Sequence, residues 1–435
     1  MKKLLIILCA IQGALMATSL TNISINDRQV PLVYEEGKYI PIVSLQLVFT
    51  NAGHLSNSKD GLADMAAKLL NEGTAKDGSL AFATKLDAQA VELHAGVGRE
   101  SFVIEISALK DDFAYVVARL KELLLDPNYT KEALDQIKYQ KLGWLQQKKS
   151  DFAYIASTAL RAEIFKGTAL AKAYDGTEES VKSITLEDIQ AFISTSLGYN
   201  NAIVLVGGDI GLEDASKYSK ELLSLLPKVN VKSSLNIQAS AKQSTVLADE
   251  ETEQAYIYFA APFDYSYKEA DQYKVSIAEY LLGGGGFGSR MMEEIRVKRG
   301  LTYGVYASLK RTKTASYMSG YLQTKLSTQE EAKKLIQEVV DTFVQKGITK
   351  EELEAAKLFL VGSEPLRVET LSQRLGRAFN DYYMQRPLGF SKTQLKKLEA
   401  VSLKDMNNFI MAHKELSKIS FSIVTKEDKK VKKGQ

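Results

Sequence analysis

Two stretches of this 435-residue chain recur later in the same order, which indicates that a domain has been duplicated. Residues 130–138 read TKEALDQIK and residues 349–357 read TKEELEAAK, at an offset of 219 (349 − 130). Residues 185–193 read TLEDIQAFI and residues 402–410 read SLKDMNNFI, at an offset of 217 (402 − 185). Two matches at nearly the same spacing favour duplication over chance, and a chain of this length should hold more than one core.

The first copy alternates strands with helices. Residues 43–49 and 102–106 alternate apolar and polar side chains, which predicts strands with one buried face. Residues 113–124 carry an apolar stripe at helical spacing. Thr185 is placed to cap a further helix, and the apolar run 202–206 predicts a final strand.

The second copy repeats this order. A strand is expected to begin at Leu301 and to alternate through residues 303–309, followed by an apolar helical stripe that ends before Gly347. Residues 419–424 predict the closing strand. We therefore expect an α+β fold with two homologous domains, each an antiparallel-rich sheet backed by helices.

The same patterns place the domain limits. We expect an N-terminal domain over residues 18–229 and a C-terminal domain over residues 245–425. Residues 230–244 are polar and serine-rich without an apolar period, which predicts a linker. Residues 426–435 form a mainly basic tail, and such runs are usually solvated chain ends.

Residues 1–17 have the pattern of a secretory signal peptide. Two lysines precede a short apolar run, which ends on small residues, and cleavage is expected near Ala17. The only cysteine, Cys9, lies in this segment, so the mature chain should have no disulfide bond. We expect a periplasmic or secreted protein without a membrane anchor, because no later stretch is long and apolar enough to span a bilayer.

The net charge argues against nucleic acid as a partner. The formal charge of +3 includes Lys2 and Lys3, so the chain after Ala17 would carry +1 (3 − 2). A nucleic-acid-binding surface normally needs a larger excess of basic residues.

Residues 61–74, GLADMAAKLLNEGT, have the frame of a zinc-peptidase motif without its ligands. The segment resembles the pitrilysin/insulinase-type zinc peptidases (inverzincins), in which the run after G-L-A reads H-x-x-E-H. In that family the two histidines hold zinc and the glutamate activates a water molecule. Here the three positions are Asp64, Ala67 and Lys68. An ammonium group repels a cation and alanine cannot accept a proton, so we expect no metal in this chain.

Other residues do not supply a replacement site. The three histidines, His54, His94 and His413, are far apart in sequence, whereas a zinc site needs three or four converging ligands. The resemblance places the family's additional acidic ligand within residues 141–146, which contain no carboxylate. The structural interpretation of Asp64 and Lys68 is an i,i+4 ion pair on a solvated helix face.

A glycine-rich run, LGGGGFGSRMMEEIRVKRGLTYG, occupies residues 282–304. Its loop glycines, Gly283, Gly284, Gly285 and Gly286, follow one expected helix and open another that should end at Gly300. The run lacks the G-K-[ST] of a P-loop, which argues against nucleotide binding. Two interpretations stay open: a turn that lets two helices pack closely, or a loop that touches a peptide or a partner chain.

The same run resembles the C-terminal domain of short two-domain members of that family and of the mitochondrial processing peptidase subunits. The family places an arginine and a tyrosine seven residues apart, and Arg296 and Tyr303 match that spacing. The resemblance implies that this pair faces the zinc of a homologous partner chain across a chamber and stabilises the oxyanion there. The structural alternative is that Arg296 pairs with Glu293 and that Tyr303 is a cross-strand aromatic residue.

Residues 93–100, LHAGVGRE, match the family's peptide-accepting strand edge. Gly96 and Gly98 would let a second backbone approach closely, as strand addition requires. The alternative is a glycine-rich hairpin turn without a ligand.

Two functions of different class follow. The first is a non-metal-binding subunit of a zinc-dependent peptidase, which binds peptide and assists an H-x-x-E-H partner in a heterodimer or larger assembly, with zinc only in the partner. The second is an inert clamshell scaffold or peptide-binding protein. A self-sufficient protease ranks third, because the chain lacks the metal ligands.

Overall fold

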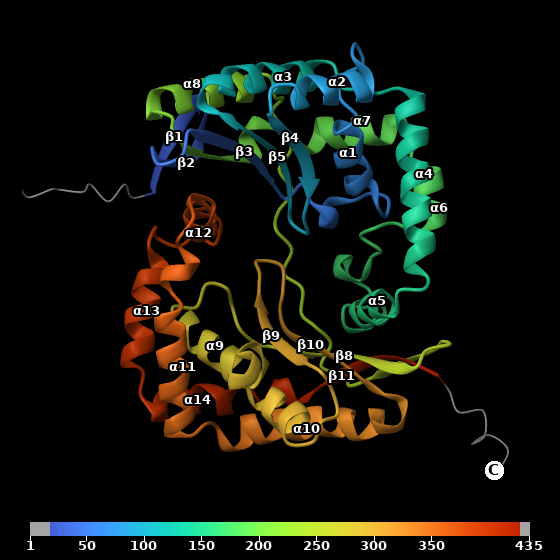
Figure 1. Ribbon diagram of the computed structural model, residues 1–435, viewed down its shortest axis with the longest axis vertical. Helices are drawn as coiled ribbons and strands as arrows, with labels where there is room; N and C mark the ends of the chain where they lie inside the picture. The colour runs from blue at the N-terminus through green and yellow to red at the C-terminus, as the bar shows by residue number, and fades with distance from the viewer. Residues whose placement is uncertain (1–17, 427–435) are drawn as a thin grey trace, which may run out of the picture.

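The computed structural model describes residues 18–426, so the expected signal peptide and residues 427–435 of the expected tail lie outside the described residues. The chain forms two α+β units, one above the other in Figure 1, each with one sheet and its own buried core. The expected fold class is confirmed.

The first unit has a six-stranded sheet in the order β1-β2-β6-β3-β5-β4. Only β2 and β6 pair in parallel; the other neighbours are antiparallel. The strands are β1 (Ser19–Ile25), β2 (Arg28–Glu36), β3 (Ile42–Thr50), β4 (Glu92–Val97), β5 (Ser101–Leu109) and β6 (Ala202–Gly208). The helices are α1 (Leu62–Leu70), α2 (Gly78–Asp87), α3 (Phe113–Leu125), α4 (Lys131–Lys148), α5 (Phe152–Ile164), α6 (Glu178–Ser183), α7 (Leu186–Ser196) and α8 (Leu212–Leu223).

The second unit has a five-stranded sheet in the order β7-β11-β8-β10-β9, again with one parallel pair, β7 and β11. If β1 is left out and the strands of each unit are numbered along the chain, the two sheets have the same strand order. The strands are β7 (Thr245–Asp249), β8 (Gln254–Pro262), β9 (Val305–Arg311), β10 (Ser316–Lys325) and β11 (Ser420–Thr425). The helices are α9 (Gln272–Glu279), α10 (Gln329–Lys346), α11 (Lys350–Gly362), α12 (Leu371–Tyr383), α13 (Phe390–Ala400) and α14 (Leu403–Ala412), with π-helical turns at Tyr280–Gly284 and Met292–Val297.

The repeated sequences are helix starts. The hydroxyl of Thr130 accepts a hydrogen bond from the Ala133 amide at the start of α4, and that of Thr349 accepts one from the Glu352 amide at the start of α11. Thr185 and Ser402 cap α7 and α14 in the same way. These caps satisfy amides that a helix leaves without partners, which explains why the pattern recurs at these positions.

The two units exchange equivalent helices. Helix α5 belongs to the first copy by sequence but packs on β8 and β11 of the second sheet, and α12 packs on β2 and β6 of the first sheet (Figure 1). Leu375 and Ala378 of α12 join Val33 and Leu205 in a buried cluster. Because each unit covers part of the other's sheet, the two units are held together by apolar burial as well as by polar contacts.

Glu100 is a central polar contact between the units. It lies at the tip of the β4–β5 hairpin and accepts hydrogen bonds from the Thr314 amide (3.1 Å) and from the Tyr383 hydroxyl (2.7 Å). Burial and the adjacent carboxylate raise the pKa of Tyr383. A second contact joins the Nε of Arg374 to the buried carboxylate of Glu35 at 2.6 Å.

One local expectation needs correction, and the segment expected as a linker has a further feature. The strand expected from Leu301 begins only at Val305, so Tyr303 lies in the bend before β9. The segment expected as a linker has no helix or strand, yet it is partly buried: the Ile237 amide donates to the Thr314 carbonyl at 2.7 Å, and Ile237 and Ala239 are in an apolar cluster between the units. Across residues 18–426, no helix is both long and apolar enough to cross a bilayer.

Candidate functional site

Helix α1 carries the three motif positions, Asp64, Ala67 and Lys68. The Oδ2 of Asp64 lies 2.9 Å from the Nζ of Lys141 on α4, and the same Nζ lies 3.6 Å from Oδ1 of Asp175. Lys141 is buried, with its side chain only 4% exposed. The expectation that Asp64 pairs with Lys68 is therefore wrong: α4 packs on α1 and brings a closer, less solvated ammonium group to the carboxylate.

An aromatic ring lies beside this ammonium group, and a phenol contacts one of its carboxylate partners. The Nζ of Lys141 lies 4.2 Å from the ring centroid of Trp144, within the range of a cation–π contact. The hydroxyl of Tyr154 donates to Oδ2 of Asp175 at 3.2 Å. Burial, with a smaller contribution from Asp175, raises the pKa of Tyr154 to about 12, so this phenol stays protonated and donates to the carboxylate.

The residues of this site do not fit a zinc ion. A zinc site needs deprotonated N, S or O donors, whereas an ammonium group faces the only carboxylate among the motif positions. His54 is nearby, and burial lowers its pKa, but its Nδ1 is buried without a hydrogen-bond partner among residues 18–426. Within that range no three histidine, cysteine, aspartate or glutamate side chains converge as metal ligands would. Lys141 supplies a buried positive charge beside the motif position Asp64.

We expect the purified mature chain to bind no stoichiometric zinc and to cleave no peptide alone, because Asp64, Ala67 and Lys68 replace the motif and Lys141 occupies its vicinity. Metal analysis of protein prepared without chelators measures the zinc content per chain. One tightly bound zinc per chain would contradict this interpretation.

Arg296 and Tyr303 form a stacked cluster with Phe287. The Cζ of Arg296 lies 4.6 Å from the ring centroid of Phe287 and 4.7 Å from that of Tyr303. Tyr303 is 89% exposed, so its hydroxyl is accessible. Neither structural alternative is found among the described residues: Arg296 forms no ion pair with Glu293, and Tyr303 lies before the strand. The rings contact the guanidinium, and no carboxylate of residues 18–426 pairs with its N–H donors.

The glycine run has two parts with different roles. A Cβ on Gly283 would lie 2.7 Å from the Cβ of Ala307 in β9, and one on Gly285 would lie 2.6 Å from the Tyr280 carbonyl oxygen. These positions require glycine because the run packs against β9 and against its own preceding turn; no contact between two helices is involved. Gly286 differs, because its φ is 55° and a Cβ placed on it would meet no atom within 4 Å.

Gly96 lies in β4, which is the free edge of the first sheet, and Gly98 begins the turn to β5. The Gly98 amide closes the hairpin by donating to the Ser101 carbonyl at 2.8 Å. A Cβ at either glycine would meet its nearest atom at 3.5 Å or more, so larger side chains fit at both positions. Gly96 thus lies at the strand edge and Gly98 at the turn of one hairpin, so each interpretation applies to one of the two glycines.

Asn71, at the end of α1, covers the middle of this edge. Its Nδ2 donates to the Ala95 carbonyl at 2.9 Å, and its Oδ1 accepts from the Ala95 amide at 2.8 Å. Antiparallel pairing directs the backbone groups of alternate residues away from β5, here those of Leu93, Ala95 and Val97. Asn71 therefore bonds the same groups of Ala95 that an added strand would use.

Bulky substitution at the edge should weaken peptide capture without unfolding the chain. Gly96→Val and Gly98→Val fit sterically but hinder a second backbone, whereas Asn71→Ala should strengthen binding by freeing Ala95. Fluorescence anisotropy of a labelled peptide measures the affinity, with Gly211→Val, which points into open space beside α8, as the control. Unchanged affinity in all edge variants would favour a simple turn.

Sequence reasoning missed Lys141 as the central residue of the degenerate site. Its signal was present, because Lys141 follows the buried residues Leu134 and Ile137 and precedes Leu145 on the inward face of α4. A lysine at a core position of an amphipathic helix indicates a buried charge that needs a carboxylate partner.

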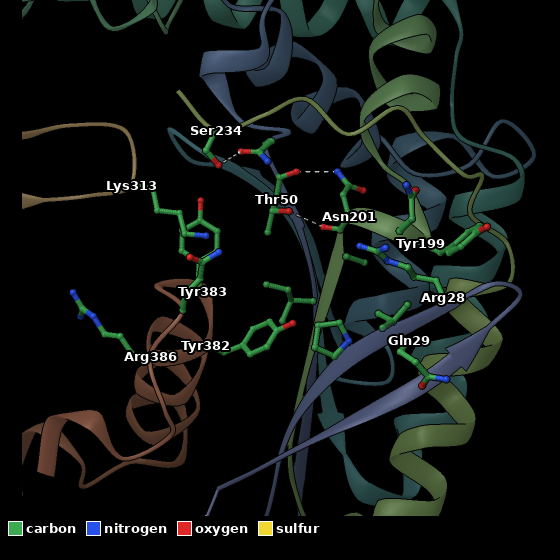
Figure 2. Close-up of a pocket in the computed structure, with 17 residues that line it drawn as sticks. Arg28, Gln29, Thr50, Tyr199, Asn201, Ser234, Lys313, Tyr382, Tyr383 and Arg386 are labelled. Atoms are coloured by element: carbon green, nitrogen blue, oxygen red, sulfur yellow. Dashed lines mark hydrogen bonds between the residues drawn. The ribbon is translucent and has the colours of Figure 1, made fainter. Parts of the chain in front are cut away.

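A polar cavity of about 540 Å³ lies between the units (Figure 2). Lys313, Tyr383 and Arg386 line one wall, and Arg28 and Asn201 line the opposite wall. The lining contains no carboxylate among the described residues. The cavity is framed by residues of both units.

Comparisons with known proteins identify one family. The model of the insulinase family (peptidase family M16) matches residues 32–178, and that of the peptidase M16 inactive domain matches residues 183–360. A protein of Helicobacter pylori described as a non-peptidase homolog, YmxG, is 41% identical over 431 residues, which cover 99% of this chain and 100% of that protein.

Solved structures show the same fold. A peptidase M16 inactive domain from Pseudomonas fluorescens superposes with a TM-score of 0.86 at 24% identity, covering 94% of this chain and 98% of that one. The first half of the periplasmic protease PqqL from Escherichia coli gives a TM-score of 0.74 at 16% identity, covering 97% and 94%. On the extent and identity of these matches, the chain belongs to the insulinase family of peptidases, family M16.

Proposed function

We propose that this chain is the non-metal-binding subunit of a zinc-dependent peptidase and acts in trans on the site of a homologous H-x-x-E-H partner. The observation that carries the proposal is the cluster of Phe287, Arg296 and Tyr303. This cluster presents an exposed phenol and a guanidinium on the second unit. No carboxylate among the described residues pairs with the guanidinium.

The chemistry of peptide hydrolysis needs these groups. The partner's zinc would supply the Lewis acid for attack on the peptide carbonyl. Negative charge then grows on the carbonyl oxygen, and fixed N–H and O–H donors aimed at that oxygen lower the barrier. Tyr303 would donate its hydroxyl hydrogen, and Arg296 would donate N–H groups to the oxygen or to a neighbouring peptide carbonyl.

Stacking prepares Arg296 for this role. An arginine side chain free in solvent loses rotamer entropy when it grips a ligand, and contact with two rings removes part of that cost beforehand. The exposure of Tyr303 suits a site that is completed by another chain. A heterodimer or larger assembly follows from this division of roles.

The second candidate is an inert clamshell scaffold or peptide-binding protein. The buried Lys141 network favours it, because the motif position Asp64 is paired with an ammonium group that would repel a metal ion. The description of the Helicobacter pylori relative as a non-peptidase homolog points the same way. The two candidates differ in one respect: only the first assigns Arg296 and Tyr303 a role in catalysis.

The proposed location is the periplasm or the exterior of a bacterial cell. The sequence of residues 1–17 supports this location. A protein of similar structure, PqqL, is described as a periplasmic protease.

Mixing this chain with an H-x-x-E-H partner should create peptidase activity that neither chain has alone. The expected result follows because each chain lacks half of the site. Cleavage of a quenched fluorescent peptide measures activity, and size-exclusion chromatography measures assembly. A complex that assembles and remains inactive on a broad peptide set would favour the scaffold.

A further inference from the structure

Three tyrosines form a continuous row across the second sheet. Tyr321 of β10 lies directly opposite Tyr258 of β8 and Tyr306 of β9 in the strand register. Their ring centroids are 5.5 Å and 5.6 Å apart, which is stacking distance. Helix α5 covers part of this sheet face, but Tyr306 and Tyr321 keep more than 40% of their surface exposed. The row is an open aromatic platform.

Two arginines from the first copy reach the same region without a counter-ion. The Cζ of Arg161, on α5, lies 4.1 Å from the ring centroid of Tyr174. Arg99, at the hairpin tip, makes only a long hydrogen bond of 3.4 Å to the Tyr317 hydroxyl. Neither forms an ion pair with a carboxylate of residues 18–426, and the Nε of Arg161 is buried without a partner.

The platform and the arginines line one cavity of about 550 Å³. Lys310 adds a third cation to the lining, and Glu279 is the only carboxylate that residues 18–426 contribute to it. Glu279 is already engaged, because its Oε2 lies 3.4 Å from the Nη2 of Arg311. The cavity therefore carries an excess of positive charge next to aromatic faces. Arg161 donates to the Lys172 carbonyl at 3.3 Å and Arg99 to the Tyr317 hydroxyl, but neither is paired with a carboxylate among residues 18–426.

We propose that this cavity binds the carboxylate of an acidic peptide segment, with Arg99 and Arg161 as its ligands and the tyrosine row as the platform for the adjoining residues. Guanidinium groups bind carboxylates with charge-assisted, often bidentate, hydrogen bonds. Tyrosine rings supply large contact area at a low entropic cost for apolar or aromatic side chains. The inference rests on the proposed function only in taking a peptide as the ligand.

The placement suits a peptide that also reaches the proposed catalytic pair. Tyr306 lies three residues after Tyr303, and Arg99 follows the edge strand β4 in sequence. An extended peptide advances about 3.3 Å per residue, so a short segment can span neighbouring subsites of this kind. The acidic residue would then select which bond is presented to the partner's metal.

Four labelled decapeptides of one sequence test the proposal on the mature chain alone. They combine an internal glutamate or glutamine with a free or amidated C-terminus, so they distinguish a side-chain carboxylate from a terminal one. Fluorescence anisotropy should show that a peptide with a carboxylate binds about tenfold or more tightly than the glutamine peptide with an amidated end.

Substitutions assign the preference to the cavity. Arg161→Gln should abolish the tenfold difference while leaving the affinity for the neutral peptide unchanged, and Arg99→Gln should reduce the difference. Tyr321→Leu should weaken all four peptides about threefold to tenfold, whereas Tyr321→Phe keeps the stacking and the affinity. Arg119→Gln, on the outer helix α3, is the matched control, because Arg119 pairs with Glu122 outside the cavity.

Equal binding of charged and neutral peptides to the wild-type chain would overturn the inference, as would a full charge preference in a folded Arg161→Gln variant. Circular dichroism and the thermal midpoint establish that each variant is folded. Because binding is measured without the partner, a missing charge preference leaves the trans-acting peptidase proposal standing. Conversely, an inactive mixed complex does not affect the charge preference.

Discussion

Replacing Tyr303 with phenylalanine should lower turnover by the mixed complex on the order of 100-fold or more, by analogy with the loss of other oxyanion donors. The substitution removes the hydroxyl and keeps the ring, so the stacking against Arg296 at 4.7 Å should persist. Turnover of a quenched peptide under saturating conditions measures the effect. Assembly should not change, because the cluster is proposed to face the substrate rather than the partner's surface.

Arg296→Ala should lower turnover and also raise KM, because the guanidinium is proposed to touch the bound peptide before the reaction begins. Alanine also releases the rings of Phe287 and Tyr303, so Arg296→Lys is the second variant. Lysine keeps the positive charge but loses the planar fork, and it should recover binding more than turnover. Tyr139→Phe, at an exposed position on α4, is the control for loss of a phenol.

If Tyr303→Phe and Arg296→Ala both assemble and cleave at wild-type rates, the pair is structural. The scaffold interpretation would then replace the peptidase subunit. A loss confined to KM would instead indicate that Arg296 binds peptide and that another group stabilises the oxyanion.

The sequence predicted the fold because duplication and periodicity are local signals. The recurring hydroxyl residues cap equivalent helices, and the alternation of residues 43–49 corresponds to β3 with its apolar side toward the core. The exchange of α5 and α12 was not predictable in this way. Both helices have an apolar face and a polar face. The periodicity predicts that the apolar face is buried, but it does not indicate which sheet covers that face.

The candidate site was predicted only in part for the same reason. The positions Asp64, Ala67 and Lys68 excluded the family's zinc ligands, but i,i+4 spacing favoured a partner on the same helix. The nearer partner, Lys141, comes from a helix 77 residues later (141 − 64) and is found only once α4 packs on α1. The tyrosine row could not be predicted for the same reason. Its three members come from three different strands, and the sequence does not specify how these strands align with one another.

Replacing Lys141 with methionine should lower the free energy of unfolding by about 2–3 kcal/mol. Methionine fills similar volume, so the main change is loss of the ammonium group that faces Asp64 and Asp175. The estimate lies below the usual cost of breaking a fully buried pair, because the two carboxylates remain 21% and 31% exposed and water can partly solvate them. Urea unfolding followed by circular dichroism measures the difference.

Two variants separate electrostatics from packing in this prediction. Lys131→Met, on the exposed end of the same helix, removes a surface ion pair with Asp135 and should cost no more than about 0.5 kcal/mol. Asp64→Asn combined with Lys141→Met should recover part of the loss, because one uncompensated carboxylate is removed together with the cation. Equal stability of Lys141→Met and Lys131→Met would show that the buried ammonium contributes nothing. A measured loss that Asp64→Asn partly reverses would mean that the buried Lys141 ammonium stabilises the motif positions, at which the family's active members bind zinc. Restoring the three motif residues alone would then leave this ammonium group beside the metal, where it would repel the cation.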